Sequence, residues 1–208
     1  MASLRSKFYS RMLRRTFRGR GFGKGLEALK RVRSGEDRSF ILSLLSQGAP
    51  AQATAEINGN YAEWLGNPQA EYTLLYLHGG GYIMGGPDTH REMVRRLAGY
   101  ANVRALLLDY RLAPENPFPA AIEDAEAAYD WLIAQGVAPE KMFVAGDSAG
   151  GGLSLARMLK LKEHGKTQPK AAALLSPWTD LTSSGESART RAERCLLYTS
   201  PSPRDGLL

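Results

Sequence analysis

A serine flanked by glycines is the feature of this sequence best able to do chemistry. Ser148 lies in the pentapeptide Gly-Asp-Ser-Ala-Gly at 146–150, which follows an apolar run at 142–145 and precedes a small-residue stretch suited to a helix. A strand, a tight turn with one serine and a helix form a nucleophile elbow, which exposes the hydroxyl at the carboxyl end of a sheet. We expect the flanking glycines to adopt φ values that a Cβ would resist. The pattern predicts Ser148 as a nucleophile.

A run of three glycines upstream supplies a second chemical feature. His78-Gly79-Gly80-Gly81 follows the apolar run 74–77. A serine that attacks a carbonyl creates an oxyanion, and backbone N–H groups stabilise it where no side chain blocks them. A flexible loop or a phosphate cradle are the alternatives, but no Lys-Ser/Thr pair follows the run and the dinucleotide-binding spacing is absent. We predict an oxyanion-binding loop, with the N–H of Ala149 as a further donor at the start of the next helix.

The histidines of this chain do not complete a catalytic triad. A serine hydroxyl needs a histidine to take its proton and a carboxylate to orient that histidine. Around such elbows the chain order is serine, acid, histidine, yet His78 and His90 precede Ser148. His164 lies sixteen residues after the serine, which is about 24 Å along a helix. We predict that His164 is a solvated residue at a helix end, that two triad members are missing, and that the chain as it stands turns over weakly or not at all.

Two acidic residues near these motifs are predicted to be supporting groups. Asp147 adjoins the nucleophile, but a general base must reach the serine proton from a separate element. Asp180 is expected to cap the turn after its strand. The sequence has one cysteine, Cys195, and no metal-ligand spacing, so we expect no disulfide framework, no metal and no cofactor.

Four sequence motifs, which follow one another in the family's order, resemble those of the hormone-sensitive-lipase-like (family IV) serine esterases of the α/β-hydrolase fold. The resemblance covers about residues 55–194. It rests on the His-Gly-Gly-Gly run at 78–81, on Asp-Tyr-Arg-Leu-Ala-Pro-Glu at 109–115 with Phe-Pro-Ala-Ala at 118–121, on the serine elbow, and on Ser-Pro-Trp-Thr-Asp-Leu at 176–181.

The resemblance implies a serine carboxylesterase that acts on short- to medium-chain acyl esters, as its small-molecule partners, through an acyl-enzyme. It implies an oxyanion hole made by the N–H groups of Gly80, Gly81 and Ala149, with His78 and Gly79 shaping the loop. The family's acid and histidine lie beyond the matching residues. Because the family also includes non-catalytic receptors that keep the pocket and lose the histidine, a ligand-binding protein is the alternative.

Apolar runs and amphipathic stretches predict an α/β fold around these motifs. We expect strands at 72–77, 103–108, 141–145 and 170–175, and helices at 89–100, 121–135 and 149–163, the first opened by Asp88 or Thr89. An Asn-Gly turn within 56–61 predicts an antiparallel hairpin at the edge. Buried strands that alternate with helices indicate a mostly parallel sheet covered on both faces, with ligands at the carboxyl ends of the strands. Both Ser148 and the glycine run fall at those ends.

The first 33 residues carry the positive charge. They hold eleven Lys/Arg against one acid, whereas residues 34–208 hold sixteen basic and twenty acidic residues. Apolar residues at helical spacing predict a basic amphipathic helix, which suits an anionic membrane or lipid surface or a transit peptide. The resemblance to the esterase family implies instead that this helix caps the active-site mouth. No nucleic-acid-reading motif accompanies the charge, so we expect no nucleic-acid partner. Without the apolar stretch of a signal peptide, we expect a cytoplasmic protein; the oligomeric state stays open.

The sequence is predicted to divide into three segments. Residues 1–50 form a basic N-terminal segment of cap helices, including helices at 26–33 and 36–46, and residues 51–194 form a partial catalytic domain. That domain is expected to be incomplete at its C-terminal end, with an exposed sheet edge. The segment 195–208 has neither helix nor strand periodicity and resembles the translation of a sequencing-library adaptor. We expect it to be non-native and the natural gene to continue beyond Arg194.

Overall fold

The computed structural model describes residues 50–182, 184–186 and 190. The predicted basic helix, the helices expected at 26–33 and 36–46 and the segment 195–208 lie outside the described residues. The chain forms two compact units, one of residues 40–179 and one of residues 1–39 with 180–208. The sheet and the candidate site belong to the first unit.

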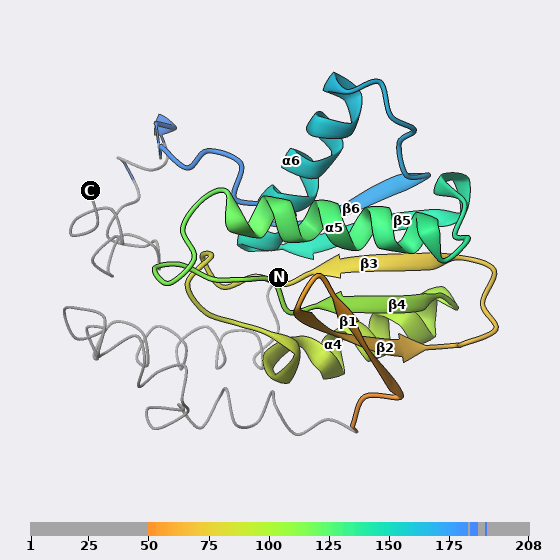
Figure 1. The fold of residues 1–208 in the computed structure, drawn as a ribbon. Helices are drawn as coiled ribbons and strands as arrows, with labels where there is room; N and C mark the ends of the chain where they lie inside the picture. Colours follow the sequence, from red (N-terminus) through yellow and green to blue (C-terminus); the bar gives the residue numbers. More distant parts are fainter. Residues whose placement is uncertain (1–49, 183, 187–189, 191–208) are drawn as a thin grey trace, which may run out of the picture. The chain divides into compact units, whose positions relative to one another are not determined.

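Six strands form one sheet, in the order β1-β2-β4-β3-β5-β6 (Figure 1). They are β1 (Ala53–Ile57), β2 (Asn60–Gly66), β3 (Thr73–Leu77), β4 (Arg104–Leu108), β5 (Met142–Asp147) and β6 (Ala171–Leu175). β2 pairs antiparallel with β1 and β4, whereas β3, β4, β5 and β6 are joined by parallel pairings. The predicted mostly parallel sheet is confirmed.

The hairpin at the sheet edge is closed by the predicted Asn-Gly turn. Asn58 and Gly59 have φ values of 51° and 81°. Two successive residues in the left-handed region form the two-residue turn whose twist matches that of the flanking strands, and Asn-Gly is its preferred sequence. The local signal therefore places β1 correctly against β2.

Among the described residues, three α-helices cover the two faces of this sheet (Figure 1). They are α4 (Pro87–Ala101), α5 (Ala120–Ala134) and α6 (Ser148–Glu163), and a 3-10 turn, η1 (Pro139–Lys141), precedes β5. Leu75 and Leu77 belong to the buried cluster that includes residues of α5 and α6, whereas Leu74 and Tyr76 belong to the cluster that includes residues of α4. Because successive strand residues point to opposite faces, a strand covered on both sides must be apolar throughout.

The start of α4 differs from the prediction. The helix begins at Pro87 with Gly86 as its N-cap residue, so neither Asp88 nor Thr89 opens it. Proline suits the first helical position, because its missing N–H would have no partner there and its φ is already helical. The hydroxyl of Thr89 lies one turn in and accepts a hydrogen bond from the Gly86 N–H at 3.1 Å.

The end of α6 explains the position of His164. This residue is the C-cap and is exposed, as predicted. Gly165 follows with a φ of 61°, the N–H of Lys166 bonds to the Leu161 carbonyl at 2.8 Å, and that of Gly165 bonds to the Lys162 carbonyl at 3.1 Å. These two bonds form a Schellman motif, which satisfies the last carbonyls of the helix.

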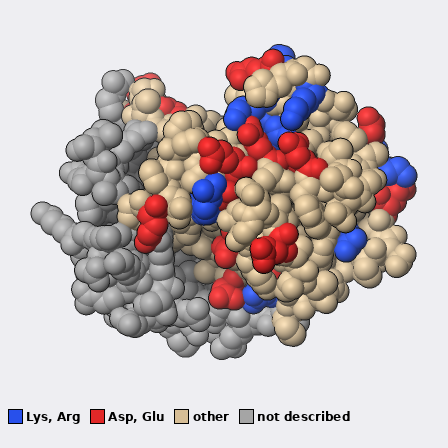
Figure 2. Space-filling view, in the orientation of Figure 1, with Lys and Arg blue, Asp and Glu red and all other residues tan. Residues whose placement is uncertain are grey.

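Acidic side chains gather over α5 on the face seen in Figure 2. Several of them are paired with nearby cations. Arg111 lies 3.2 Å from Glu123, Lys160 of α6 lies 2.6 Å from Glu126, and Arg157 of α6 lies 3.1 Å from Asp130. Much of this surface charge is therefore balanced locally.

Candidate active site

The main chain turns sharply at Ser148. β5 ends at Asp147 and α6 begins at Ser148, which has a φ of 51°. A residue other than glycine in the left-handed region costs about 1–3 kcal/mol and persists only where its surroundings hold it there. The carbonyl of Ser148 accepts a hydrogen bond from the N–H of Trp178 at 2.8 Å, which helps to fix the turn.

The two elbow glycines serve a different purpose from the one predicted. Neither Gly146 nor Gly150 has a positive φ, so the expectation that they adopt conformations closed to other residues is wrong. A Cβ on Gly146 would lie 2.5 Å from the Leu77 carbonyl oxygen, and one on Gly150 would overlap the carbonyl oxygens of Leu77 and His78. The serine itself carries the strained φ, and the glycines leave room for the end of β3.

The glycine run after β3 forms a tight turn. Gly80 and Gly81 have φ values of 129° and 66°, and the Gly80 carbonyl accepts hydrogen bonds from the N–H groups of Ile83 at 3.2 Å and Met84 at 3.0 Å. Within the described part of the chain, no acceptor bonds to the N–H of Gly80 or Gly81. Both donors are therefore available to a bound group.

His78 is buried beneath this turn. Its side chain is 0% exposed, its ring stacks on Tyr110 with centroids 4.1 Å apart, and the Tyr110 hydroxyl donates to the His78 carbonyl at 2.6 Å. Burial lowers the pKa of His78 to about 4, so the imidazole is neutral near pH 7 and its Nδ1 donates to the Gly79 carbonyl at 2.8 Å. This geometry suits a residue that shapes the loop.

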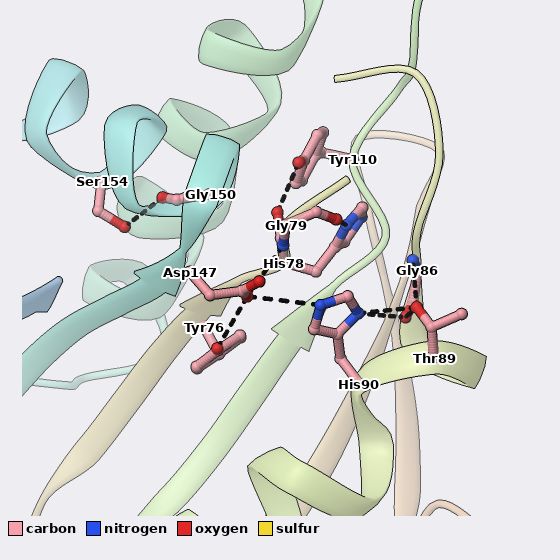
Figure 3. Close-up of polar contacts among 10 residues, drawn as sticks. All are labelled: Tyr76, His78, Gly79, Gly86, Thr89, His90, Tyr110, Asp147, Gly150 and Ser154. Atoms are coloured by element: carbon pink, nitrogen blue, oxygen red, sulfur yellow. Dashed lines mark hydrogen bonds and ion pairs between the residues drawn. The ribbon is translucent and has the colours of Figure 1, made fainter. Parts of the chain in front are cut away.

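Asp147 connects three segments of the fold (Figure 3). Its carboxylate accepts hydrogen bonds from the Tyr76 hydroxyl and the Gly79 N–H, each at 3.0 Å, and lies 3.4 Å from Nε2 of His90 on α4. Burial opposes ionisation, but the bonds from His90, Tyr76 and Gly79 outweigh it and hold the pKa of Asp147 below its usual value. An ionised carboxylate thus ties β3, the elbow and α4 together.

Sequence reasoning missed His90. Its position before Ser148 in the chain excludes it as the base and suggests no other role. Its residue type and its place on the helix after the glycine run were the available signals, but neither shows that the start of α4 lies beside the elbow.

The last of the four motifs also reaches the elbow. Besides the bond to Ser148, Trp178 lies with its ring 6.3 Å from that of Tyr82, and a Cβ on Gly152 would overlap the Trp178 carbonyl oxygen. In the second unit, Asp180 accepts hydrogen bonds from the N–H groups of Thr182 at 3.0 Å and Ser184 at 2.7 Å. Asp180 therefore stabilises a turn, as predicted.

This chain is similar in sequence and fold to known proteins. The family described as alpha/beta hydrolase fold matches residues 74–204. The chain belongs to this family. The alpha/beta hydrolase match takes in part of the segment 195–208, whose origin stays a prediction.

Named relatives of this alpha/beta hydrolase chain include esterases. An acetyl-hydrolase of Streptomyces hygroscopicus is 44% identical over 151 residues, which are 72% of this chain and 50% of that protein. The crystal structure of an esterase/lipase from an uncultured bacterium is 40% identical with a TM-score of 0.74, over 90% of this chain and 64% of that one. The crystal structure of an esterase from the bacterial hormone-sensitive lipase family is 36% identical with a TM-score of 0.74, over 98% of this chain and 67% of that one. The resemblance to hormone-sensitive-lipase-like esterases is confirmed, and the chain spans half the length of the Streptomyces relative.

The described residues include neither a metal-binding cluster nor a membrane-spanning helix. No group of three or more His, Cys, Asp or Glu residues there could hold a metal ion. No helix among them is both long enough and apolar enough to cross a bilayer.

Proposed function

We propose that this chain carries the nucleophile and the oxyanion hole of a serine carboxylesterase. The hydrogen bond from the Gly79 N–H to the Asp147 carboxylate is the observation that supports this most directly. It joins the glycine run to the residue immediately before Ser148, so the predicted nucleophile and the predicted donors start from neighbouring strand ends. β3 and β5 pair in register at Leu77 and Gly146, which agrees with this arrangement.

In this mechanism, the Ser148 hydroxyl oxygen attacks the ester carbonyl carbon. The oxyanion accepts hydrogen bonds from the N–H groups of Gly80, Gly81 and Ala149. A base, which the resemblance assigns to a histidine beyond the matching residues, takes the serine proton and passes it to the departing alkoxide, which leaves as the alcohol. Water then hydrolyses the acyl-enzyme to the carboxylic acid and free Ser148. Loss of one such donor typically costs about 3 kcal/mol in the transition state. The unbonded N–H groups of Gly80 and Gly81 within the described residues support this assignment.

We infer that the substrates are short- to medium-chain acyl esters, with acetyl esters the first to test. The Streptomyces relative is named an acetyl-hydrolase, and a Pseudomonas putida relative, 40% identical over 113 residues, is named an ethyl acetate hydrolase. The expected substrate is thus a small-molecule ester.

The test is covalent labelling of the purified chain by a fluorophosphonate. Because His78 and His90 precede Ser148 in the chain and His164 caps the far end of α6, free imidazole is added as an external base for the serine proton. We expect labelling of the peptide that contains Ser148, at a rate that rises with imidazole concentration, and none in Ser148→Ala. Labelling spread over other serines, or unchanged in Ser148→Ala, would contradict the proposal. A chain that binds esters yet leaves Ser148 unlabelled would support the ligand-binding alternative.

A further inference from the structure

His90 contacts the elbow from the first turn of α4 (Figure 3). Its Nε2 lies 3.4 Å from Asp147 Oδ1, and its side chain is 15% exposed. The same carboxylate oxygen accepts the Gly79 N–H at 3.0 Å. One oxygen atom therefore links the helix, the elbow and the glycine run.

Nδ1 of His90 faces Thr89 and the end of the loop before α4. It lies 2.7 Å from the Thr89 hydroxyl oxygen and 3.3 Å from the Gly86 carbonyl oxygen, and the hydroxyl oxygen lies 2.9 Å from the same carbonyl. A hydroxyl can donate or accept by rotating. It donates to the bare Nδ1 of a neutral imidazole, and it accepts from Nδ1–H of a charged one while its own proton turns to the Gly86 carbonyl.

The consequence is that Nε2 carries a proton in both charge states. An ionised carboxylate can only accept, and it is a stronger acceptor than the Gly86 carbonyl that faces Nδ1. The Nε2–H therefore donates to Asp147 whether His90 is neutral or charged, and the Thr89 hydroxyl adapts to either state. Without this donor, partial burial would favour a protonated Asp147. A neutral carboxyl group is a weaker acceptor than a carboxylate for the Gly79 N–H.

We propose that His90 is a positioning residue for the oxyanion loop. Through Asp147 it holds the Gly79 N–H, and with it Gly80 and Gly81, against the elbow that carries Ser148. Its effect on catalysis rests on the proposed esterase function, whereas the hydrogen-bond arrangement can be tested without it.

The first experiment uses the unaltered full chain. Long-range ¹H–¹⁵N spectra of the histidine side chains report which ring nitrogen is protonated. We expect His90 in its neutral form to carry the proton on Nε2. A neutral His90 protonated on Nδ1 would overturn the proposal, and this readout does not depend on whether any variant folds.

The second experiment compares His90→Leu, which removes the donor, with His90→Gln, which keeps an N–H. We expect the leucine variant to shift the Gly79 amide proton upfield and to slow fluorophosphonate labelling of Ser148 about 10- to 100-fold, as misplaced catalytic groups do. The glutamine variant should restore most of the Gly79 amide shift and most of the labelling rate. His164→Leu is the matched control, because that histidine is exposed at the far end of α6, and it should behave as the unaltered chain.

The outcomes separate the two proposals. His90→Leu with an unchanged Gly79 resonance and an unchanged labelling rate would overturn the positioning role. If the unaltered chain is never labelled, the esterase proposal fails, while the Gly79 resonance and the His90 tautomer still decide whether His90 holds the loop.

Discussion

Single residues limit how closely the chain approaches itself at the elbow. Gly150 faces two carbonyl oxygens of the main chain at a distance that leaves no room for a methyl group. Main-chain atoms cannot rotate away as a long side chain can, so the strand or the helix would have to move. The elbow glycines are therefore a requirement of packing.

We predict that Gly150→Ala destabilises the fold by about 3 kcal/mol, the upper range for an overpacked site. Gly99→Ala is the matched control, since a Cβ there meets nothing within 4 Å and Gly99 lies within α4 without a positive φ. Alanine should stabilise that helix by about 0.5–1 kcal/mol. Urea unfolding of both variants measures these changes, and equal effects would refute the packing argument.

A second prediction at this scale concerns the carboxyl group of Asp109. Burial, with the nearby charges of Asp88 and Glu63, raises the pKa of Asp109 to about 6. The unfolded chain, with an ordinary pKa of about 3.9, releases this proton at lower pH than the folded chain does. This group's contribution to stability therefore falls as pH rises from about 4 to about 6, and it stays low above that range.

Asp109→Asn removes this penalty. We expect the variant to melt at a higher temperature than the unaltered chain at pH 7, with a difference that shrinks steadily as the pH is lowered to about 4. Thermal unfolding of both proteins in the same buffers cancels the effects of all other groups. A difference that is constant with pH would show that ionisation of Asp109 is not its cause.

At the scale of secondary-structure elements, an ion pair between Arg91 and Glu63 joins α4 to β2. The Arg91 guanidinium donates to both carboxylate oxygens of Glu63, at 2.7 and 2.6 Å, and the Glu63 side chain is 1% exposed. We predict that Arg91→Leu lowers the free energy of unfolding by about 3–5 kcal/mol, because it leaves the buried Glu63 carboxylate without its cation.

The control for this prediction lies on the same helix. Arg95 pairs with Glu92 on the helix surface, and exposed pairs contribute little. Arg95→Leu should therefore leave the urea midpoint unchanged. If both variants lost the same stability, the loss would come from helix formation and not from the link between α4 and β2.

The sequence predicts elements where local pattern and tertiary structure agree. The apolar run 74–77 reads as a buried strand because helices cover both of its faces, and the Asn-Gly pair at 58–59 suffices to define its turn. The start that the sequence predicts for α4 is too late, because Asp88 and Thr89 both resemble N-cap residues, whereas the helix begins at Pro87.

The site was less predictable than the fold. The Gly-Asp-Ser-Ala-Gly pattern identifies Ser148, but it does not show why the flanking residues are glycines. A positive φ and a close main-chain contact both require glycine, so the sequence cannot distinguish them. The contact between His90 and Asp147 joins residues 57 positions apart in the chain. It exists only because α4, β3 and β5 converge, and no local pattern contains that information.

At the scale of the whole molecule, β6 ends the described sheet. Among the described strands it pairs with β5 alone, and Ala171, Ala173 and Leu175 are exposed. An exposed apolar edge strand is a template for pairing with another chain. We therefore expect this chain to self-associate through β6 in solution.

We predict that Ala173→Lys reduces aggregation on warming, measured by light scattering, because a charge on an edge strand opposes pairing. Ala134→Lys adds the same charge at an exposed position at the end of α5 and should have a smaller effect. Equal protection by both variants would point to net charge as the cause and would count against the strand edge.

The left-handed backbone at Ser148 limits which replacements can test the nucleophile. Threonine offers the same alcohol, but its branched Cβ makes this conformation a severe outlier. Cysteine is unbranched and fits the turn while exchanging oxygen for sulfur. Ser148→Thr would therefore deform the main chain although it keeps the alcohol, whereas Ser148→Cys would preserve the main chain although it replaces the reacting oxygen with sulfur.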